Sequence, residues 1–339
     1  MKRHRKQNAR SNPRLLSFGL IVLISISLGC KGLEFSNPNS PDLSGASLQS
    51  LVAGSEAGMR IDLDVYLQVT ITIGREGYFF EPADPRFTGE IIFGPVDPGG
   101  FLTLRPWSAR YQVVFNCNEL LLRAEELSDP QKSAVEGYAK TIRGYQLLLN
   151  LNYLDENGIR LNFDGDLTKP FATKEEAFDF IENDLNEANT ALASAGDSFP
   201  FRLSDGFAGF DTPSAFARFN RAVMARVLVF RGKFDQALQV LEQSFLEPAG
   251  DLNLGVFHIY GTGLGDQLNP VFQVPTAPFV KLMAHPSFEA DAEPGDLRVQ
   301  NKVFKRSDVT VFDELNSDLA ITLATTSTDP FPIIRATRS

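Results

Sequence analysis

The chain has 339 residues, of which 43% are hydrophobic, so it is long and apolar enough to bury a large core in one domain or two. Its formal net charge of −10 argues against nucleic acid as a partner, because an acidic protein repels the phosphate backbone. Two cysteines are too few for a disulfide framework, and Cys117, inside an apolar run, is predicted to be a buried and inert thiol.

The N-terminal residues have the layout of a secretory signal. Residues 1–14 carry six basic side chains and no acidic ones, and residues 15–28 form an apolar run of 14 residues. That run is shorter than the roughly 20 residues that a membrane-spanning helix needs, but it suits the apolar region of a signal peptide. Gly29 and Cys30 follow as in a lipobox, although Ser27 stands where that pattern prefers leucine.

We therefore predict a signal peptide over residues 1–29 and acylation of Cys30 with chains such as palmitate. Acyl chains hold a protein on a membrane without a spanning segment, and the rest of the sequence has no apolar run of spanning length. Residues 30–47 are rich in polar and turn-forming residues and are predicted to be an extended tether. The folded domain is predicted over residues 48–339.

The first part of that domain gives mixed signals. Residues 48–59 favour a helix, whereas residues 61–65 alternate like a strand, and periodicity alone does not decide the structure of this segment. Residues 75–104 are rich in glycine, proline and aromatic residues and are predicted to be a long loop.

Helical patterns dominate from Pro106, which marks a helix start, to residue 245. Thr173 and Glu176 form the pattern of a capping box. Gly232 ends one helix, and the residues after it are similar to the turn of a tetratricopeptide repeat. Five helices are predicted here, over residues 106–127, 130–154, 173–192, 213–231 and 234–245. After residue 250 the sequence indicates loops with a few short strands, for example over residues 271–274.

The sequence carries no pattern that indicates an enzyme. His258 and His285 are far apart, and there is neither a His-Glu-x-x-His zinc motif nor a Gly-x-Ser-x-Gly elbow. A proline closely follows the glycine-rich residues 261–265, so no helix can present its N-terminus to a phosphate there. The acidic residues 164–166 lack the spacing of a known calcium loop. We expect no enzymatic activity, no cofactor and no bound metal.

Several segments resemble the SusD/RagB family of nutrient-binding outer-membrane lipoproteins. Each match is weak alone, but together they follow the family's order along nearly the whole mature chain. They are the lipobox-like cysteine, the Asn- and Pro-rich residues 37–41, and residues 74–76, 84–86, 179–188, 220–227, 295–298 and 331–335. The resemblance implies a mainly α fold, a tetratricopeptide-like helical-repeat (α–α) scaffold with long loops and few short strands.

The resemblance also implies a function. Members of the family capture a nutrient, here expected to be an oligosaccharide, on the outside of the outer membrane, and act as a lid on a SusC-like TonB-dependent β-barrel transporter. In the family, the motif at residues 331–335 leads into further helices. This chain ends at Ser339, so we expect the C-terminal part of the domain to be missing. Without those helices, residues 1–339 produced alone are expected to expose apolar surface and to be poorly soluble.

Sugar rings stack on aromatic faces, so aromatic residues outside the core are the candidates for ligand binding. Most aromatic residues here, phenylalanine above all, are expected in the core, and Tyr78 and Trp107 are the predicted ligand-binding residues. The family's ligand residues vary with substrate, so the resemblance transfers none of them. Other functions stay open: a peptide-capturing relative on the same scaffold, a helical-repeat adaptor that binds only protein, a lipoprotein hydrolase, or a nonfunctional remnant.

Overall fold

The computed structural model describes residues 45–335, apart from residues 82–83, 248, 252, 279, 313–316 and 324–325. The chain divides into two compact units, Met1–Ala46 and Ser47–Ser339, of which the second contains the elements below. The predicted signal peptide and the predicted acylation site Cys30 lie outside the described residues. In the part of the chain that is described, no helix is both long and apolar enough to cross a membrane.

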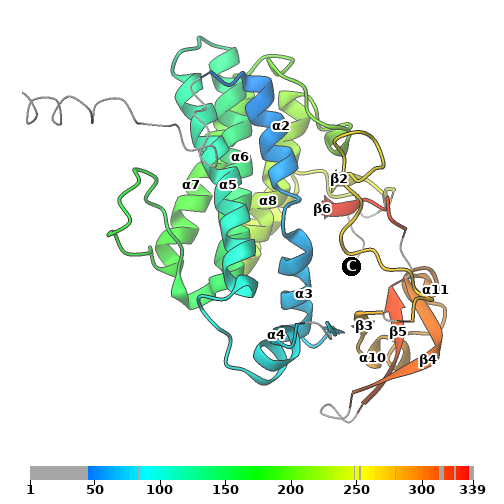
Figure 1. The fold of residues 1–339 in the computed structure, drawn as a ribbon. Helices are drawn as coiled ribbons and strands as arrows, with labels where there is room; N and C mark the ends of the chain where they lie inside the picture. The colour runs from blue at the N-terminus through cyan, green and yellow to red at the C-terminus, as the bar shows by residue number, and fades with distance from the viewer. Residues whose placement is uncertain are drawn as a thin grey trace, which may run out of the picture. The chain divides into compact units, whose positions relative to one another are not determined.

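The second unit is mainly α-helical, as the sequence predicted (Figure 1). Its main helices are α2 (Leu48–Gly58), α5 (Phe101–Ala124), α6 (Gln131–Leu154), α7 (Lys174–Ala193), α8 (Pro213–Phe230) and α9 (Phe234–Leu241). Each packs against the next in this order, from α2 to α9. Short turns join α5 to α6 and α8 to α9, so both pairs are antiparallel, as in a helical repeat.

Helix α6 lies at the centre of this layer, where α5, α7 and α8 all contact it. Two glycines allow α7 to approach closely. A Cβ atom on Gly137 would lie 2.5 Å from Leu192 Cγ, and one on Gly144 would lie 3.3 Å from Leu185 Cγ. Both leucines lie on the buried face of α7, together with Phe178, Ile181 and Ala188.

Local signals set the ends of the later helices. The Thr173 hydroxyl accepts a hydrogen bond from the Glu176 amide, and the Glu176 carboxylate accepts one from the Thr173 amide at 2.8 Å, which confirms the capping box. Pro213 lies in the first turn of α8, and Gly232, just after this helix, has a φ of 68°. Helix α9 ends at Leu241, four residues before the predicted end.

The segment with mixed signals is helical. Helix α3 (Leu63–Ile73) starts within the alternating residues, and its buried side chains include Val65, Val69 and Thr72. These three are spaced by four and three residues, so they lie on one face of a helix. The strand-like alternation at residues 61–65 is too short to override that face.

The prediction of a long loop over residues 75–104 is wrong in part. The segment contains strand β1 (Gly77–Phe79), helix α4 (Arg86–Thr88), the π-helix η1 (Gly89–Phe93) and the first turn of α5. Phe79 and Phe87 are buried with Leu102 in one apolar cluster, with ring centroids 4.6 Å apart for the two phenylalanines. The aromatic residues of this segment therefore build core around its turns.

Helix α5 begins five residues before the predicted start at Pro106, so the proline lies inside the helix. Proline has no N–H group and cannot bond to the carbonyl of Leu102, one turn earlier. The Tyr153 hydroxyl donates to that carbonyl instead, at 2.6 Å. A side chain of α6 thus satisfies the backbone acceptor that the proline leaves open, and the helix continues through Pro106.

Replacing Tyr153 with phenylalanine is expected to lower the free energy of unfolding by about 1–3 kcal/mol, because the Leu102 carbonyl loses its donor. Tyr66→Phe is the matched control: its ring stacks on that of Tyr153 at 5.1 Å, but its hydroxyl forms no hydrogen bond with any residue that is described. Urea denaturation of both variants measures the difference. Equal losses would show that the bond to Leu102 is not the cause.

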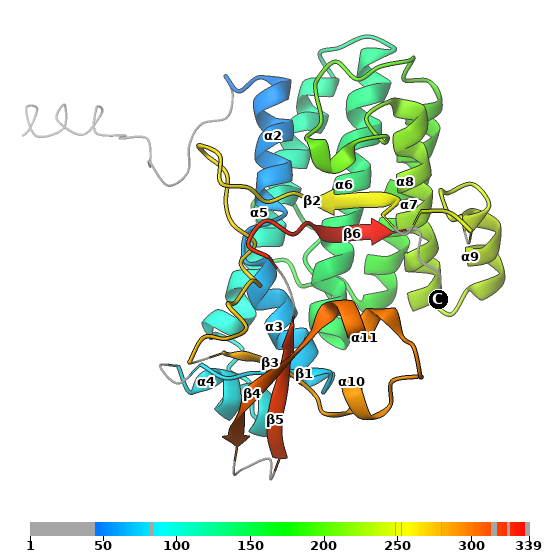
Figure 2. The same ribbon diagram turned by 90° about the vertical axis from the view of Figure 1, so that its right-hand side faces the viewer.

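The described residues form three antiparallel strand pairs, two of which join segments that are far apart in the sequence (Figure 2). Strand β1 pairs with β3 (Leu282–Ala284), β2 (Gly255–His258) pairs with β6 (Phe331–Arg335), and β4 (Val303–Phe312) pairs with β5 (Ser317–Leu323). The short helices of the unit are η2 (Asp155–Asn157), η3 (Asp205–Phe207), α10 (Ser287–Ala290) and α11 (Leu297–Lys302). The predicted strand at residues 271–274 is wrong, since these residues form a turn and irregular backbone.

A buried ion pair links α6 to α7. The guanidinium of Arg143 donates to both carboxylate oxygens of Asp184, each at 2.7 Å, and Asp184 is 2% exposed. Arg143 also donates to the side-chain oxygen of Asn118 on α5 at 2.7 Å, and it lies 5.3 Å from the ring centroid of Phe180. One side chain therefore connects three helices of the layer.

Candidate functional site

A groove of about 780 Å³ lies where α5 begins and α6 ends. These two helices are antiparallel, so the first turns of one lie beside the last turn of the other. Helix α3, which packs against α5 at this end of the layer (Figure 1), forms a third wall. Residues of η1, of the 96–98 turn and of the loop after α6 complete the lining.

Three aromatic side chains line the groove: Trp107 from α5, Tyr153 from α6 and Phe171 from the loop that follows. Trp107 is half-buried, and its ring centroid lies 4.6 Å from that of Tyr111. Phe171 is exposed, with the Arg160 guanidinium 5.6 Å from its ring centroid. Burial raises the pKa of Tyr153 above its ordinary value, so this side chain is neutral at physiological pH.

Amide and hydroxyl groups lie among these rings. The exposed side chain of Asn152 forms no hydrogen bond with any residue that is described. The Asn157 amide donates to the Leu154 carbonyl at 2.9 Å, which leaves its side-chain oxygen as an acceptor. The Thr103 hydroxyl donates to the Asp97 carbonyl at 2.9 Å and likewise keeps its acceptor capacity. Aromatic faces next to such groups can hold both the ring and the hydroxyls of a sugar.

The loop over residues 159–172 carries Phe171 and is closed at its base. Ile159 and Ala172 exchange two backbone hydrogen bonds, at 3.2 and 2.8 Å. Gly158, just before the loop, has a φ of 68°, and a Cβ atom there would lie 1.9 Å from the Ala172 carbonyl oxygen. Only glycine fits this position, so its presence lets the chain fold back and places Phe171 at the groove.

The loop is also fastened to the helices and to itself. The Tyr111 hydroxyl of α5 donates to the Arg160 carbonyl at 2.7 Å. The Arg160 guanidinium donates to the carbonyls of Asp166 and Leu167, at 3.0 and 3.3 Å. These bonds fix the path of the loop beside the groove.

Of the two predicted ligand-binding residues, Trp107 lines this groove and Tyr78 does not. Tyr78 lies in β1, is 6% exposed, and packs with Ile92, Val280 and Met283. The structure does not bring the two residues together, and the ligand role of each stays a prediction. Sequence reasoning did not find Tyr153 or Phe171, because one ends a regular amphipathic helix and the other lies in a polar loop.

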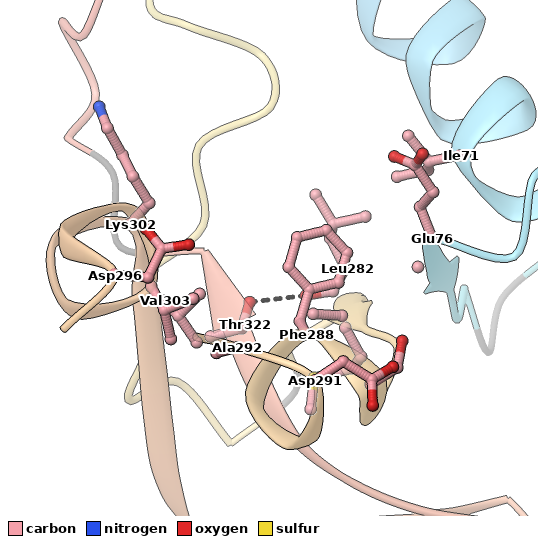
Figure 3. Close-up of a pocket in the computed structure, with 15 residues that line it drawn as sticks. Ile71, Glu76, Leu282, Phe288, Asp291, Ala292, Asp296, Lys302, Val303 and Thr322 are labelled. Atoms are coloured by element: carbon pink, nitrogen blue, oxygen red, sulfur yellow. Dashed lines mark hydrogen bonds between the residues drawn. The ribbon is translucent and has the colours of Figure 1, made fainter. Parts of the chain in front are cut away.

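A second pocket, of about 510 Å³, has a different chemistry (Figure 3). Leu282 and Phe288 provide part of its apolar wall, and the Thr322 hydroxyl donates to the Leu282 carbonyl at 2.6 Å. The carboxylates of Glu76 and Asp291 also line it. Phe288 is its one aromatic residue among those described, against three in the groove.

A third cavity, of about 380 Å³, lies between α2 and β2 and contains buried ionisable groups. Burial and two nearby guanidinium groups lower the pKa of His258 to about 3, so its imidazole is neutral at physiological pH. Burial raises the pKa of the Glu56 carboxyl. Among the described residues, no three His, Cys, Asp or Glu side chains are placed to hold a metal ion.

Cys117 is fully buried on α5, and this burial raises the pKa of its thiol to about 12. A thiol that stays protonated is a poor nucleophile. The prediction that this cysteine is buried is confirmed, and the raised pKa of the thiol supports the expectation that it is inert.

No family model and no curated protein matches this sequence. Solved structures do share its fold. A SusD-like carbohydrate binding protein from Bacteroides vulgatus ATCC 8482 matches with a TM-score of 0.58 at 15% identity, over 84% of this chain and 67% of the other. A structure with xylogluco-oligosaccharide matches with a TM-score of 0.57 at 15% identity, over 85% and 69% of the two chains. A laminarin binding SusD-like protein matches with a TM-score of 0.55 at 17% identity, over 83% and 70%.

The described unit therefore has the fold of the SusD-like proteins. The matches extend over most of this chain and over about two thirds of those three structures. This confirms the predicted fold class, a mainly α scaffold of packed helix pairs with few short strands.

Proposed function

We propose that this chain is a glycan-binding protein of the SusD/RagB family and that the groove around Trp107 binds the glycan. The observation that carries the proposal is the set of three aromatic side chains beside amide and hydroxyl groups in one groove. Two structures with the same fold support it, since one is described with xylogluco-oligosaccharide and the other as laminarin binding. Binding and release require no covalent chemistry, so the chain acts as a capture protein and not as an enzyme.

The proposed setting is the outer membrane, facing outside. Acylation at Cys30 anchors the mature chain there, and a SusC-like TonB-dependent transporter takes up the captured oligosaccharide. The signal-peptide pattern and the family resemblance support this part of the proposal. Affinity purification from the native outer membrane with mass spectrometry tests it, and recovery without a β-barrel transporter would contradict it.

Replacing Trp107 with alanine is expected to weaken glycan binding at least about tenfold, because the sugar loses a stacking surface worth about 1.4 kcal/mol or more. Isothermal titration calorimetry of the full chain in detergent, with xyloglucan oligosaccharides and laminarin as probes, measures the change. Phe288→Ala, in the second pocket, is the matched comparison and should bind like the wild type. Loss of binding in the Phe288 variant alone would show that the glycan binds in the second pocket and not in the groove.

A protein-only adaptor is the second candidate, and one surface favours it. Phe230, Phe234 and Leu238, at the junction of α8 and α9, are exposed large apolar side chains. Such patches commonly mark protein-binding surfaces. An adaptor would retain protein partners in the outer-membrane purification but would bind no glycan in the calorimeter, so the two measurements separate these functions.

A further inference from the structure

None of the sixteen described residues that line the Trp107 groove carries a charge. The lining contains apolar, aromatic, amide and hydroxyl side chains only, together with backbone. Carboxylates line the second pocket, and Glu56, Arg60 and Asp266 line the third cavity. Charge is therefore absent from the very pocket that is richest in aromatic side chains, within a chain in which 22% of residues are charged.

The described cations next to the groove lie outside its lining, and each forms a hydrogen bond or an ion pair with another group of the chain. Arg105, which follows the lining residue Leu104, forms an ion pair with Asp62. Arg75, after the lining residue Gly74, donates to the Ile92 carbonyl at 3.1 Å. The Arg160 guanidinium, near Phe171, is held by the two loop carbonyls. No cation of the described residues lines the groove to receive an anionic group.

Three carboxylates are direct or near neighbours in sequence of lining residues. Asp97 stands between two lining residues of the 96–98 turn, and its side chain accepts a hydrogen bond from the Gly99 amide at 2.9 Å. Asp155 and Glu156 follow the lining residue Leu154, and both pair with Lys174, at 2.6 and 2.7 Å. Lys174 carries one positive charge for the two carboxylates that it pairs with, so the net charge of these neighbours, Asp97 included, is negative and disfavours an anionic ligand.

We infer that the groove selects neutral oligosaccharides and rejects those that carry carboxylate groups. This inference rests on the proposed glycan-binding function and specifies its substrate class. A carboxylate taken into the groove would lose water without gaining a cation, whereas a sugar hydroxyl can bond to the free amide and hydroxyl groups. The groove therefore discriminates in two ways: the charge of an acidic oligosaccharide stays unpaired, and the hydroxyls of a neutral one form hydrogen bonds.

The test compares two ligands that differ only in charge. Xyloglucan oligosaccharides and laminari-oligosaccharides are each titrated as neutral sugars and after oxidation of their free primary alcohols to carboxylates. The oxidised forms are expected to bind the full chain at least about tenfold more weakly. Equal binding of both forms would overturn the inference and leave the glycan-binding function intact. Absence of binding by either form would overturn both.

The second measurement asks whether a cation added to the groove reverses the preference for neutral sugars. Leu104→Arg places a cation on the groove lining, at a side chain that is 46% exposed, and should strengthen binding of the oxidised sugars about tenfold relative to the neutral ones. That gain should shrink in about 1 M salt, where the Debye length is about 3 Å. Leu122→Arg, on the same helix but outside the groove, is 56% exposed and is the control. An equal gain in both variants would show that net charge, and not the groove, sets the preference.

Discussion

Replacing Asp184 with alanine is expected to lower the free energy of unfolding by about 3–5 kcal/mol. The change removes the acceptor of two hydrogen bonds from Arg143 and leaves the guanidinium of that residue without its counter-charge between α6 and α7. Among the described residues, its remaining hydrogen-bond partner is the side-chain oxygen of Asn118, which is neutral, as is the nearby ring of Phe180. An unpaired charge inside a helical layer costs more than the pair itself contributes, so the loss should be large.

Urea denaturation of the full chain measures this loss. Asp179→Ala is the matched control, because Asp179 lies on the same helix and also pairs with an arginine, Arg231, at 2.8 Å. Its side chain is 70% exposed, so water screens the pair and the expected cost is only about 0–1 kcal/mol. Similar losses in the two variants would contradict the view that burial makes the Asp184 pair important.

Replacing Gly158 with alanine is expected to lower the free energy of unfolding by about 3 kcal/mol and to weaken glycan binding as well. The new methyl group would overlap the Ala172 carbonyl oxygen, and an L side chain would be held at a φ of 68° and a ψ of −173°. Relief of this overlap requires the Ile159–Ala172 hydrogen bonds to break. Phe171 is adjacent to Ala172 and would leave the groove with it.

Gly165→Ala separates the overlap from the backbone conformation. Gly165 lies in the same loop with a φ of 85°, but a Cβ atom there would meet no atom within 4 Å. Its cost is expected to be about 1 kcal/mol, from the left-handed conformation alone, with no change in glycan affinity. Thermal or urea unfolding together with calorimetry measures both effects. A Gly158 variant that behaved like the Gly165 variant would show that the base of the loop shifts freely.

The parts of the fold that depend on local signals were predictable from the sequence. The capping box at Thr173, the proline at the start of α8 and the glycine after it act through their own neighbours in the chain. The start of α5 was not predictable, because Pro106 is a good marker of helix starts. Its compensating donor, Tyr153, lies far along the chain on another helix. The strand pairs β1–β3 and β2–β6 escape prediction for the same reason.

The candidate site was predictable only in part. Trp107 was singled out as an aromatic residue beside a predicted helix start, and it does line the groove, although its ligand role remains a prediction. Tyr78 lies among turn-forming residues in the sequence, yet pairing of β1 with β3 buries it. Tyr153 and Phe171 join Trp107 only after the helices stack and the loop closes. Contacts among residues so far apart in the chain depend on tertiary structure, and no periodic pattern in the sequence indicates them.

The closure of the 159–172 loop by two main-chain hydrogen bonds makes this loop a module. The closure itself uses only the backbone of Ile159 and Ala172 and requires Gly158, so most residues between them can change in kind and number. Phe163 is an exception, because its ring packs against Phe180 of α7. Trp107 and Tyr153 come from the helices and would stay in place when the loop changes, whereas Phe171 comes from the loop and would change with it. Exchange of the segment between the anchors is thus a route by which one helical scaffold can acquire new ligand preferences, in nature or by engineering.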